Sequence, residues 1–428
     1  MLVADFATLL ATYEKGFCII IEQVSAVRAW EEPMHQCAEI HDRIATQPAH
    51  ALITTASQSQ QFPALFPLRQ NERTDEHLPL FQFCCNDASI AIRPIFERFQ
   101  SVVITSGTLS PIDMYPRILG FQPRAVHSFS MSFSRNVICP LVVTRGADQV
   151  PLCSKFDTRS DAATIRNYGK LLVETAAAVP DGIVAFFTSY LYMQEIVRVW
   201  HDMGVLSDVL KHKLVFIETQ DMLETTMALE NFKRACDSGR GALFLSIARG
   251  KVAEGVDFDR HYGRAVLLLG VPYQYTLSRV LRARLEYLHD TCAINEADFL
   301  TFDAIRQAAQ CAGRVIRGKT DYGIVIFGDK RYNRADKRDK LPQWIRQFMV
   351  ENALNLSTDI AMHRARRFLR DMAQPEPQNS TVSLSLDELR LDACYVERTL
   401  TAAIAPQPLQ KTDVPPGVAV EESYRIDR

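Results

Sequence analysis

Six short runs of apolar residues recur between residues 137 and 327, and each run is bounded by polar or turn-forming residues. The runs are VICPLVV, GIVAFF, KLVFI, ALFLSI, AVLLLG and GIVIF. Strands that are buried on both faces of a parallel sheet give continuous apolar runs of this kind, whereas half-exposed strands alternate between apolar and polar residues. The pattern therefore predicts six strands of one parallel sheet.

Apolar residues at helical spacing fall between most of these runs and predict helices. The predicted helices lie at 161–178, 190–203, 222–236 and 276–288, and two more follow the last strand at 342–353 and 358–372. Strands that alternate with helices form an α/β fold, in which helices cover both faces of a parallel sheet. Residues 131–375 are therefore expected to form one such domain, followed by a Pro-rich, low-order tail at 376–428.

The first 130 residues follow a less regular pattern. The run FCIIIE (17–22) predicts a strand, and the region from about 25 to 80 lacks periodicity, which predicts a mobile insertion. Order is expected to resume with LFQFCC and a helix from about Asp87 to Phe99. The run VVIT (102–105) then predicts a strand that ends in the turn SGTLSP.

Composition and charge narrow the class of protein. The chain of 428 residues has 47% hydrophobic and 23% charged residues, which is typical of a soluble protein of two or three domains. Its net charge of −2 does not indicate a nucleic-acid partner, but residues 313–346 carry ten Lys or Arg against four Asp. The N-terminal residues lack a cationic region and a sufficiently long apolar stretch, so no membrane role is expected.

Ten cysteines are scattered along the chain. Apart from the adjacent Cys84 and Cys85, none has the two-residue gap that zinc and iron–sulfur sites favour. Reduced, buried thiols in a cytosolic or nuclear protein are the favoured interpretation. No metal site is predicted.

The stretch GRVIRGKT (313–320) fits the phosphate-loop pattern, in which backbone amides between a strand and a helix surround phosphates. Here a helix is predicted before the stretch and a strand after it, so Lys319 would face the negative end of a helix dipole. This order excludes a phosphate loop and a small kinase built on one. The segment instead offers Arg314 and Arg317 one turn apart on one face of a helix, with Gln310 a turn before.

Polar turns follow three of the predicted strands, with the sequences TSGTLSP, TSY and ARGKVAEGVDF. In α/β folds, ligands meet the carboxyl ends of the strands. The third turn is the richest, because it interleaves charged residues with glycines that let the backbone approach a ligand: Arg249, Gly250, Lys251, Glu254, Gly255 and Asp257. A solvated charged loop is the alternative for any one turn, but together they indicate a ligand-binding edge.

Five segments resemble, in order, the later motifs of the superfamily 2 DNA helicases of the xeroderma pigmentosum group D type, a subunit of transcription and repair factor IIH. They are ITSGTLSP, GIVAFFTSY, SIARGKVAEGVDF, GVPYQYT and QAAQCAGRVIRGKTDYG. The similarity covers roughly residues 85–375. It implies a motor of two RecA-like lobes, with ATP between them and single-stranded DNA across their tops. Residues 131–375 would form the second lobe, helicase domain 2, and residues 1–130 an incomplete part of helicase domain 1.

The resemblance also implies roles for individual residues. The arginine-finger motif, which reaches the γ-phosphate of ATP, would comprise Gln310, Arg314 and Arg317. Nucleotide and DNA would be faced by Glu254, Gly255 and Asp257, and hydrolysis would be coupled to movement by Thr105, Ser106 and Thr108. The expected DNA contacts are Ser189, Tyr190, Arg249, Lys251, Tyr273 and Tyr275, although tyrosines at such turns are as often packing residues.

Nothing in residues 1–84 supplies the family's own phosphate loop, its acidic magnesium-binding motif or the four cysteines of its [4Fe–4S] cluster. The chain is therefore expected to lack the main binding groups for ATP and Mg²⁺ and to be inactive in hydrolysis by itself. It is interpreted as the C-terminal part of an ATP-dependent 5′–3′ DNA helicase of nucleotide excision repair and transcription initiation. The alternative is a natural short form, a scaffold whose surface at 330–375 docks the regulatory subunit of factor IIH.

The run DKRYNRADKRDK (329–340) has the charge of a nuclear-import signal. Acidic residues interspersed through it favour a solvated or DNA-facing loop instead. A nuclear location is therefore expected from the family alone.

Overall fold

A computed structural model of the chain describes residues 17–25, 77–129, 135–318 and 321–374. For residues 17–25 and 77–83, the backbone alone is described. The predicted tail and nearly all of the predicted insertion lie outside these ranges. No helix in the described part of the chain combines the length and the hydropathy that a membrane span needs.

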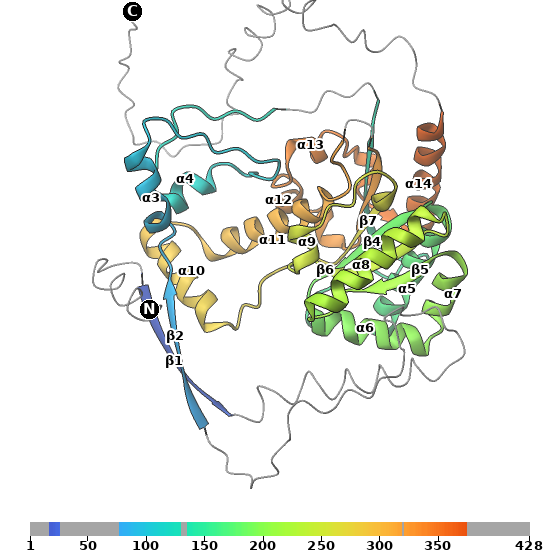
Figure 1. Ribbon diagram of the computed structural model, residues 1–428, viewed down its shortest axis with the longest axis horizontal. Helices are drawn as coiled ribbons and strands as arrows, with labels where there is room; N and C mark the ends of the chain where they lie inside the picture. The colour runs from blue at the N-terminus through green and yellow to red at the C-terminus, as the bar shows by residue number, and fades with distance from the viewer. Residues whose placement is uncertain (1–16, 26–76, 130–134, 319–320, 375–428) are drawn as a thin grey trace, which may run out of the picture. The chain divides into compact units, whose positions relative to one another are not determined.

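A parallel sheet of seven strands dominates the described chain (Figure 1). Its strands run in the order β5 (Leu214–Ile217), β6 (Ala242–Ile247), β4 (Gly182–Phe187), β7 (Ala265–Leu269), β8 (Gly323–Phe327), β3 (Ile138–Arg145) and β9 (Leu356–Ser357). The six predicted strands are confirmed. All residues of β4, β6, β7 and β8 are buried, as their unbroken apolar runs imply. The pattern does not predict β9, because two residues are too few to show a period.

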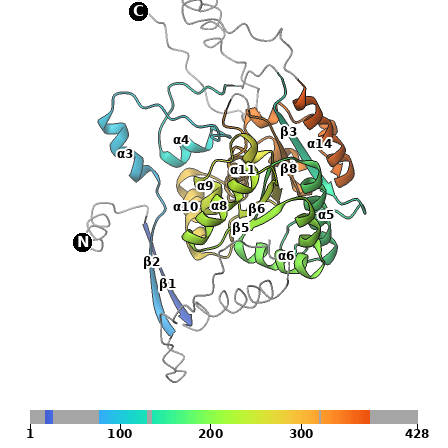
Figure 2. The same ribbon diagram turned by 45° about the vertical axis from the view of Figure 1, so that its right-hand side comes forward.

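Helices cover both faces of the sheet, as expected for a RecA-like domain (Figure 2). One face buries apolar side chains of α5 (Ala162–Ala178), α6 (Tyr190–Asp202), α7 (Val205–His212) and α14 (Thr358–Ala373). The other buries those of α8 (Met222–Asp237), α9 (Lys251–Gly255), α11 (Glu296–Ala312) and α13 (Gln343–Arg346). Side-chain caps fix several starts; the Asp221 carboxylate, for example, accepts the N–H groups of Leu223 and Glu224 at the start of α8.

One predicted helix is wrong. The stretch 342–353 contains only the short α13 and the 3₁₀ turn η3 (Glu351–Ala353). The backbone becomes extended at Val350, with a ψ of 146°. Because of this break, Ala353 packs into the core cluster on one face of the sheet and Leu354 into the cluster on the other face. An unbroken helix would not direct the two side chains in this way.

The described residues before the sheet, 17–25, 77–129 and 135–137, contain two strands and two helices. β1 (Phe17–Ser25) and β2 (His77–Cys85) pair antiparallel, followed by α3 (Ser89–Arg98) and α4 (Met114–Leu119). The predicted insertion therefore ends a few residues too late, because 77–80 belong to β2. The predicted strand at 102–105 is wrong: these residues have no regular structure, and Val103 is 87% exposed. A strand needs a neighbour for its backbone groups, and no described residue pairs with this segment.

The segment around α4 packs against α10 (Arg279–Cys292) and α11. Met114 is buried among Leu281, Leu285 and Phe302. The Arg117 guanidinium donates to the carbonyl oxygens of Cys292 and Ala293, which satisfies acceptors at the end of α10. The remaining elements are η1 (Arg260–Gly263), η2 (Lys330–Asn333) and α12 (Ala335–Arg338).

Candidate functional site

The loop after α11 contains the two arginines that the pattern places on one helix. This prediction is wrong in one respect, because α11 ends at Ala312 and both arginines lie in the loop beyond it. The backbone of the loop is bonded elsewhere: the Arg314 carbonyl accepts the Phe258 N–H at 3.1 Å. The loop is thus tied to the segment after α9, and that contact positions the arginines.

Arg314 is fully engaged with the end of α9. Its Nε donates to the Ala253 carbonyl and its Nη2 to the Glu254 carbonyl, both at 2.6 Å, and its Nη1 donates to Asp257 Oδ1 at 3.0 Å. Only 14% of the side chain is exposed. A guanidinium presents its donors in a fixed fork, and here each of its three nitrogens donates one hydrogen bond. In this state Arg314 holds the turn at Asp257 in place.

Arg317 is different, because 45% of its side chain is exposed and its guanidinium donates to Asp257 Oδ1. Asp257 itself is 51% exposed. Gln310 lies half-buried on the last turn of α11. The structure therefore brings Arg314, Arg317 and Asp257 together, with Arg317 the arginine that is open to solvent.

A buried carboxylate occupies the backbone amides that a phosphate loop would offer. Asp321 Oδ2 accepts the N–H groups of Arg317 at 2.9 Å and of Gly318 at 2.5 Å, and Oδ1 accepts the N–H of Arg260. Asp321 is 2% exposed. The predicted order is confirmed as well, since the segment follows helix α11 and precedes strand β8.

The loop after β6 begins with a buried charge cluster. Arg249 donates twice to the Pro272 carbonyl and once, at 2.6 Å, to Asp303 Oδ2. Asp303 also accepts from Gln274 at 2.6 Å and from Arg306 at 2.9 Å. Burial raises the pKa of the Asp303 carboxyl, but Arg249 and the other donors lower it further, so the net pKa is below the ordinary value. The Arg249 guanidinium thus binds Pro272 and Asp303 and has a structural role here, although Arg249 was predicted as a DNA contact.

The other polar residues of this loop face solvent. Lys251 starts α9 and is exposed, as are Glu254 and Gly255. The Glu254 side chain is not needed for the arginine contact, because Arg314 binds its backbone carbonyl. Lys251 is therefore a cation at the carboxyl edge that is available to a ligand.

Glu218 is a buried acid that the sequence pattern did not identify. It follows β5 and is 1% exposed. Its Oε2 accepts the Ser246 hydroxyl at 2.6 Å and the Ile247 N–H at 3.1 Å, and its Oε1 accepts the Tyr190 hydroxyl at 3.0 Å. Burial and the Glu218 charge both raise the Tyr190 pKa. An acid directly after a buried strand is the signal that could have drawn attention to Glu218.

The remaining predicted DNA contacts divide into free and engaged groups. The Ser189 hydroxyl caps α6 by accepting the Tyr192 N–H, and the Tyr190 hydroxyl is bound to Glu218. Tyr273 is partly buried against the core, whereas Tyr275 is 71% exposed. Of the four side chains, Tyr275 is the one that offers a ring to solvent.

The interpretation of the basic run at 329–340 as a solvated or DNA-facing loop is wrong for Arg331 and Lys337, although Arg334 is 67% exposed. The Arg331 guanidinium donates to Asp329 and Ser154, and Lys337 donates to Asp336. The Lys337 side chain is buried and the Arg331 side chain is 12% exposed, and both cations lie within 6 Å of the Tyr273 ring. These charges stabilise the carboxyl edge of the sheet instead of forming an open import signal.

The turn that contains Thr105, Ser106 and Thr108 is distant from Asp257 in the sequence. In the structure it contacts α13. The Ser106 hydroxyl accepts the Thr108 N–H at 3.2 Å, which closes the turn. The Trp344 indole N–H donates to the Gly107 carbonyl at 2.7 Å. Thr105 and Ser106 are exposed.

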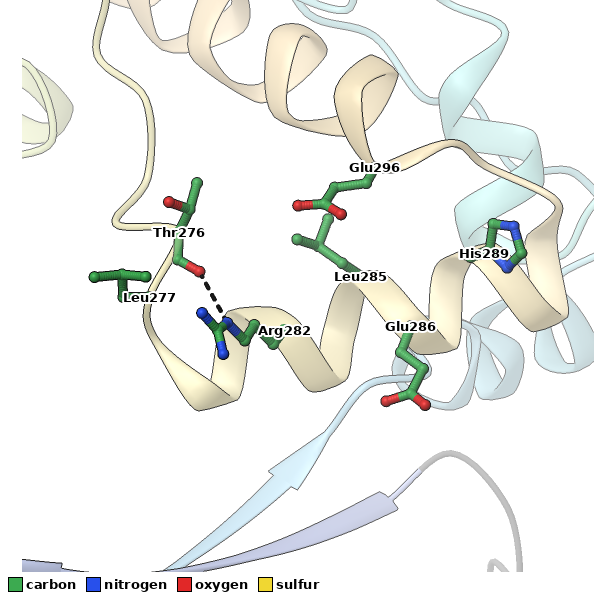
Figure 3. A pocket seen from close by; sticks show the side chains of 7 residues that line it. All are labelled: Thr276, Leu277, Arg282, Leu285, Glu286, His289 and Glu296. Carbon is green, nitrogen blue, oxygen red and sulfur yellow. Dashed lines mark hydrogen bonds between the residues drawn. The ribbon is translucent and has the colours of Figure 1, made fainter. Parts of the chain in front are cut away.

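Two open grooves lie near these residues. One, of about 590 Å³, is lined at one end by Asp257 and Arg317 and along α8 by Thr226, Leu229, Glu230 and Lys233. The other, of about 500 Å³, lies beside α10 and contains Arg282, Glu286 and His289 (Figure 3). In that groove the Arg282 Nε donates to the Thr276 carbonyl. The second groove contains none of the predicted site residues.

Within the described ranges, no three His, Cys, Asp or Glu side chains gather as a metal site. The described cysteines therefore do not fit the ligand set of an iron–sulfur cluster. Asp257 is paired with two arginines in this state, which does not fit a free carboxylate ligand for Mg²⁺.

Comparison with known proteins supports one family. Residues 172–348 match the helicase C-terminal domain. The chain is 56% identical over 380 residues to an Arabidopsis thaliana protein named general transcription and DNA repair factor IIH helicase subunit XPD, covering 89% of this chain and 44% of that protein. A Dictyostelium discoideum protein of the same name is 52% identical over 401 residues, covering 94% of this chain and 45% of that protein.

A solved XPD helicase structure is 19% identical, with a TM-score of 0.48, and the match covers 66% of this chain and 47% of that one. The chain spans less than half the length of the curated relatives named above.

Proposed function

Because the chain belongs to the XPD-type family of superfamily 2 DNA helicases, we propose that it is the C-terminal portion of an ATP-dependent 5′–3′ DNA helicase. In this proposal residues 131–375 form the second motor lobe. ATP lies between that lobe and a first lobe of which this chain holds only a part, and single-stranded DNA crosses the carboxyl edge of the sheet. One observation carries the proposal: Arg317 is an exposed guanidinium fixed beside Asp257 by a loop that Arg314 anchors.

Catalysis by such a lobe is electrostatic. Charge develops on the transferring γ-phosphoryl group, and an arginine supplied from the opposite lobe stabilises it. We propose that Arg317 exchanges Asp257 for the phosphate when ATP is bound and that Arg314 keeps the turn in place, with Gln310 beside them. Glu254 and Gly255 would line the same edge. The described residues supply no phosphate loop, so the first lobe would hold most of the nucleotide and its Mg²⁺.

The DNA contacts that the geometry supports best are Lys251, which can bind a phosphate, and Tyr275, whose exposed ring can stack on a base. Ser189 and Tyr190 border the same edge with their hydroxyls already bonded. Arg249 and Tyr273 are proposed to support the loops that present these residues. Thr105, Ser106 and Thr108 are proposed to couple hydrolysis to movement.

The relatives are named as subunits of transcription and DNA repair factor IIH. We therefore propose that this chain acts in the nucleus, in nucleotide excision repair and transcription initiation, beside the other core subunits of that factor. A regulatory subunit would dock on the second lobe. The described cysteines supply no iron–sulfur site, and no role in this chain is proposed for that cluster.

The test uses a chimera in which this chain is joined to the first-lobe half of the Arabidopsis relative. Arg317→Ala is expected to lower the rate of ATP hydrolysis about a thousandfold, because the transition state loses its arginine. Arg367→Ala, an exposed arginine on α14, serves as the matched control and is expected to keep the full rate. Full activity of the Arg317 variant would refute the finger assignment. A chimera without hydrolysis that still binds the regulatory subunit would favour the scaffold alternative.

A further inference from the structure

Trp344 lies between the turn at 106–108 and the loop that contains Arg314 and Arg317. In the proposed function, the turn couples hydrolysis to movement and the loop binds the phosphate. On one side, its indole N–H donates to the Gly107 carbonyl at 2.7 Å, within the turn of Ser106 and Thr108. On the other side, an edge of its ring lies beside Gly313, where an added Cβ would lie 3.7 Å from Cζ2. Gly313 is the residue immediately before Arg314. One side chain is thus hydrogen-bonded to the turn at 106–108 and lies beside the residue at which the arginine loop begins.

Trp344 is partly buried and packs against the core. It belongs to α13, a short helix whose next residue, Ile345, is fully buried, and its ring packs against the core cluster that contains Val315 and α11. The indole has one donor and no acceptor, so the bond to Gly107 uses its whole polar capacity. In Figure 1, the segment before α4 runs toward the region of α13, as this contact requires.

The turn is anchored a second time, shortly after Gly107. Met114 is buried against α10 and α11, and Arg117 donates to the end of α10. Of these two anchors, only the Trp344 contact adjoins the arginine loop. A displacement of Arg314 therefore has a direct route to the turn through Gly313 and the indole.

We propose that Trp344 is a positioning residue that couples the turn at 106–108 to the loop of Arg314 and Arg317. The proposal rests on the proposed function, because it identifies the contact through which a change at the arginines reaches the first-lobe turn. The contact itself does not require ATP. A substitution at Asp257, which binds both arginines, should therefore change the environment of Gly107, and only while the indole is present.

The test uses this chain with glycine alone labelled with ¹⁵N, because both ends of the bridge are glycines and the sequence contains 18 of them. Gly107→Ala and Gly313→Ala identify the two signals; an added Cβ meets nothing within 4 Å at Gly107 and nothing closer than 3.4 Å at Gly313. The perturbation is Asp257→Ala, which releases Arg314 and Arg317 from their carboxylate. It is made in the wild type, in Trp344→Phe and in Ile345→Val.

Asp257→Ala is expected to shift the Gly107 and Gly313 signals in the wild type. In Trp344→Phe, which keeps an aromatic ring on α13 but removes the indole N–H and Cζ2, the Gly107 response should fall at least about threefold, because the hydrogen bond to the Gly107 carbonyl is lost. Ile345→Val alters the same helix without touching the turn, so both responses should persist.

An unchanged Gly107 response in Trp344→Phe would overturn the proposal, as would the absence of any response in the wild type. A general loosening of α13 would instead abolish the response in Ile345→Val too, which would equally reject a specific role for the indole. None of these results depends on ATP hydrolysis, so they are distinguishable from failure of the chimera.

Discussion

Two carboxylates at the carboxyl edge of the sheet are each held by two arginines, but one cluster is buried and the other is open. Asp303, with Arg249 and Arg306, is 7% exposed, whereas Asp257, with Arg314 and Arg317, is 51% exposed. A buried ion pair cannot exchange partners without leaving a desolvated charge, while an exposed pair can. The first cluster therefore builds the edge, and the second is suited to release an arginine to an anionic ligand.

The largest expected effect is on the buried cluster. Arg249→Ala should lower the free energy of unfolding by about 3 kcal/mol, because Asp303 keeps its charge but loses its closest cation. Urea denaturation measures this loss. Lys251→Ala, two residues away and exposed, is the matched control and should change stability by less than about 0.5 kcal/mol. If both variants changed the free energy of unfolding by the same small amount, the Asp303 cluster would not differ in stability from the exposed Asp257 cluster.

The same cluster predicts a pH dependence with a defined sign. The pKa of Asp303 is lowered in the folded state, so the unfolded chain binds more protons in acid. The stabilisation is present above the ordinary carboxyl pKa of about 3.9 and is lost as the pH falls through the lowered folded value. Asp303→Asn should therefore lose less unfolding free energy than the wild type between about pH 6 and pH 3, an effect smaller than that of Arg249→Ala. Parallel stability curves for the two proteins would contradict this.

Residues 250–257 join the two clusters, and Gly250 tests how rigid this connection is. A Cβ at Gly250 would lie 2.6 Å from Glu218 Oε1, a buried carboxylate oxygen that also accepts the Tyr190 hydroxyl. Gly250→Ala should cost about 1 to 3 kcal/mol in thermal or urea unfolding, since neither side can move freely. At Gly255 an added Cβ meets nothing within 4 Å, so Gly255→Ala should be neutral or slightly stabilising. A tolerated alanine at Gly250 would show that Glu218 is not fixed.

The sheet was predictable because its signal is local. Runs such as GIVAFF and ALFLSI are almost entirely apolar, and a strand covered on both faces gives that pattern. The run at 102–105 has the same local composition but no partner strand among the described residues. Composition therefore indicates what a segment can form, and pairing decides whether it does.

The sequence could not show which charged side chains are buried in ion pairs and which stay exposed, because this depends on contacts between residues that are distant in sequence. Arg249 and Arg317 look alike in the chain, yet Asp303 lies 54 residues beyond the first and Asp257 lies 60 before the second. Glu218 is likewise completed by residues 28 positions to either side. Arg331 and Lys337 belong to a run that reads as solvated, and only the fold brings Tyr273 beside them. Spacing identified the edge, and the fold determined which cations remain free.

The smallest expected effect is on the open cluster, and it decides whether the two clusters really differ. Asp257→Ala should change the free energy of unfolding by no more than about 1 kcal/mol, because exposed ion pairs contribute little. High salt should reduce even this difference, since screening acts on exposed charges more than on buried ones. The measurement is urea denaturation at low and high salt beside Arg249→Ala. If Asp257→Ala destabilised the chain as strongly, Arg317 would be a structural residue in the same sense as Arg249, and its exchange from Asp257 to a phosphate would be too costly for a motor.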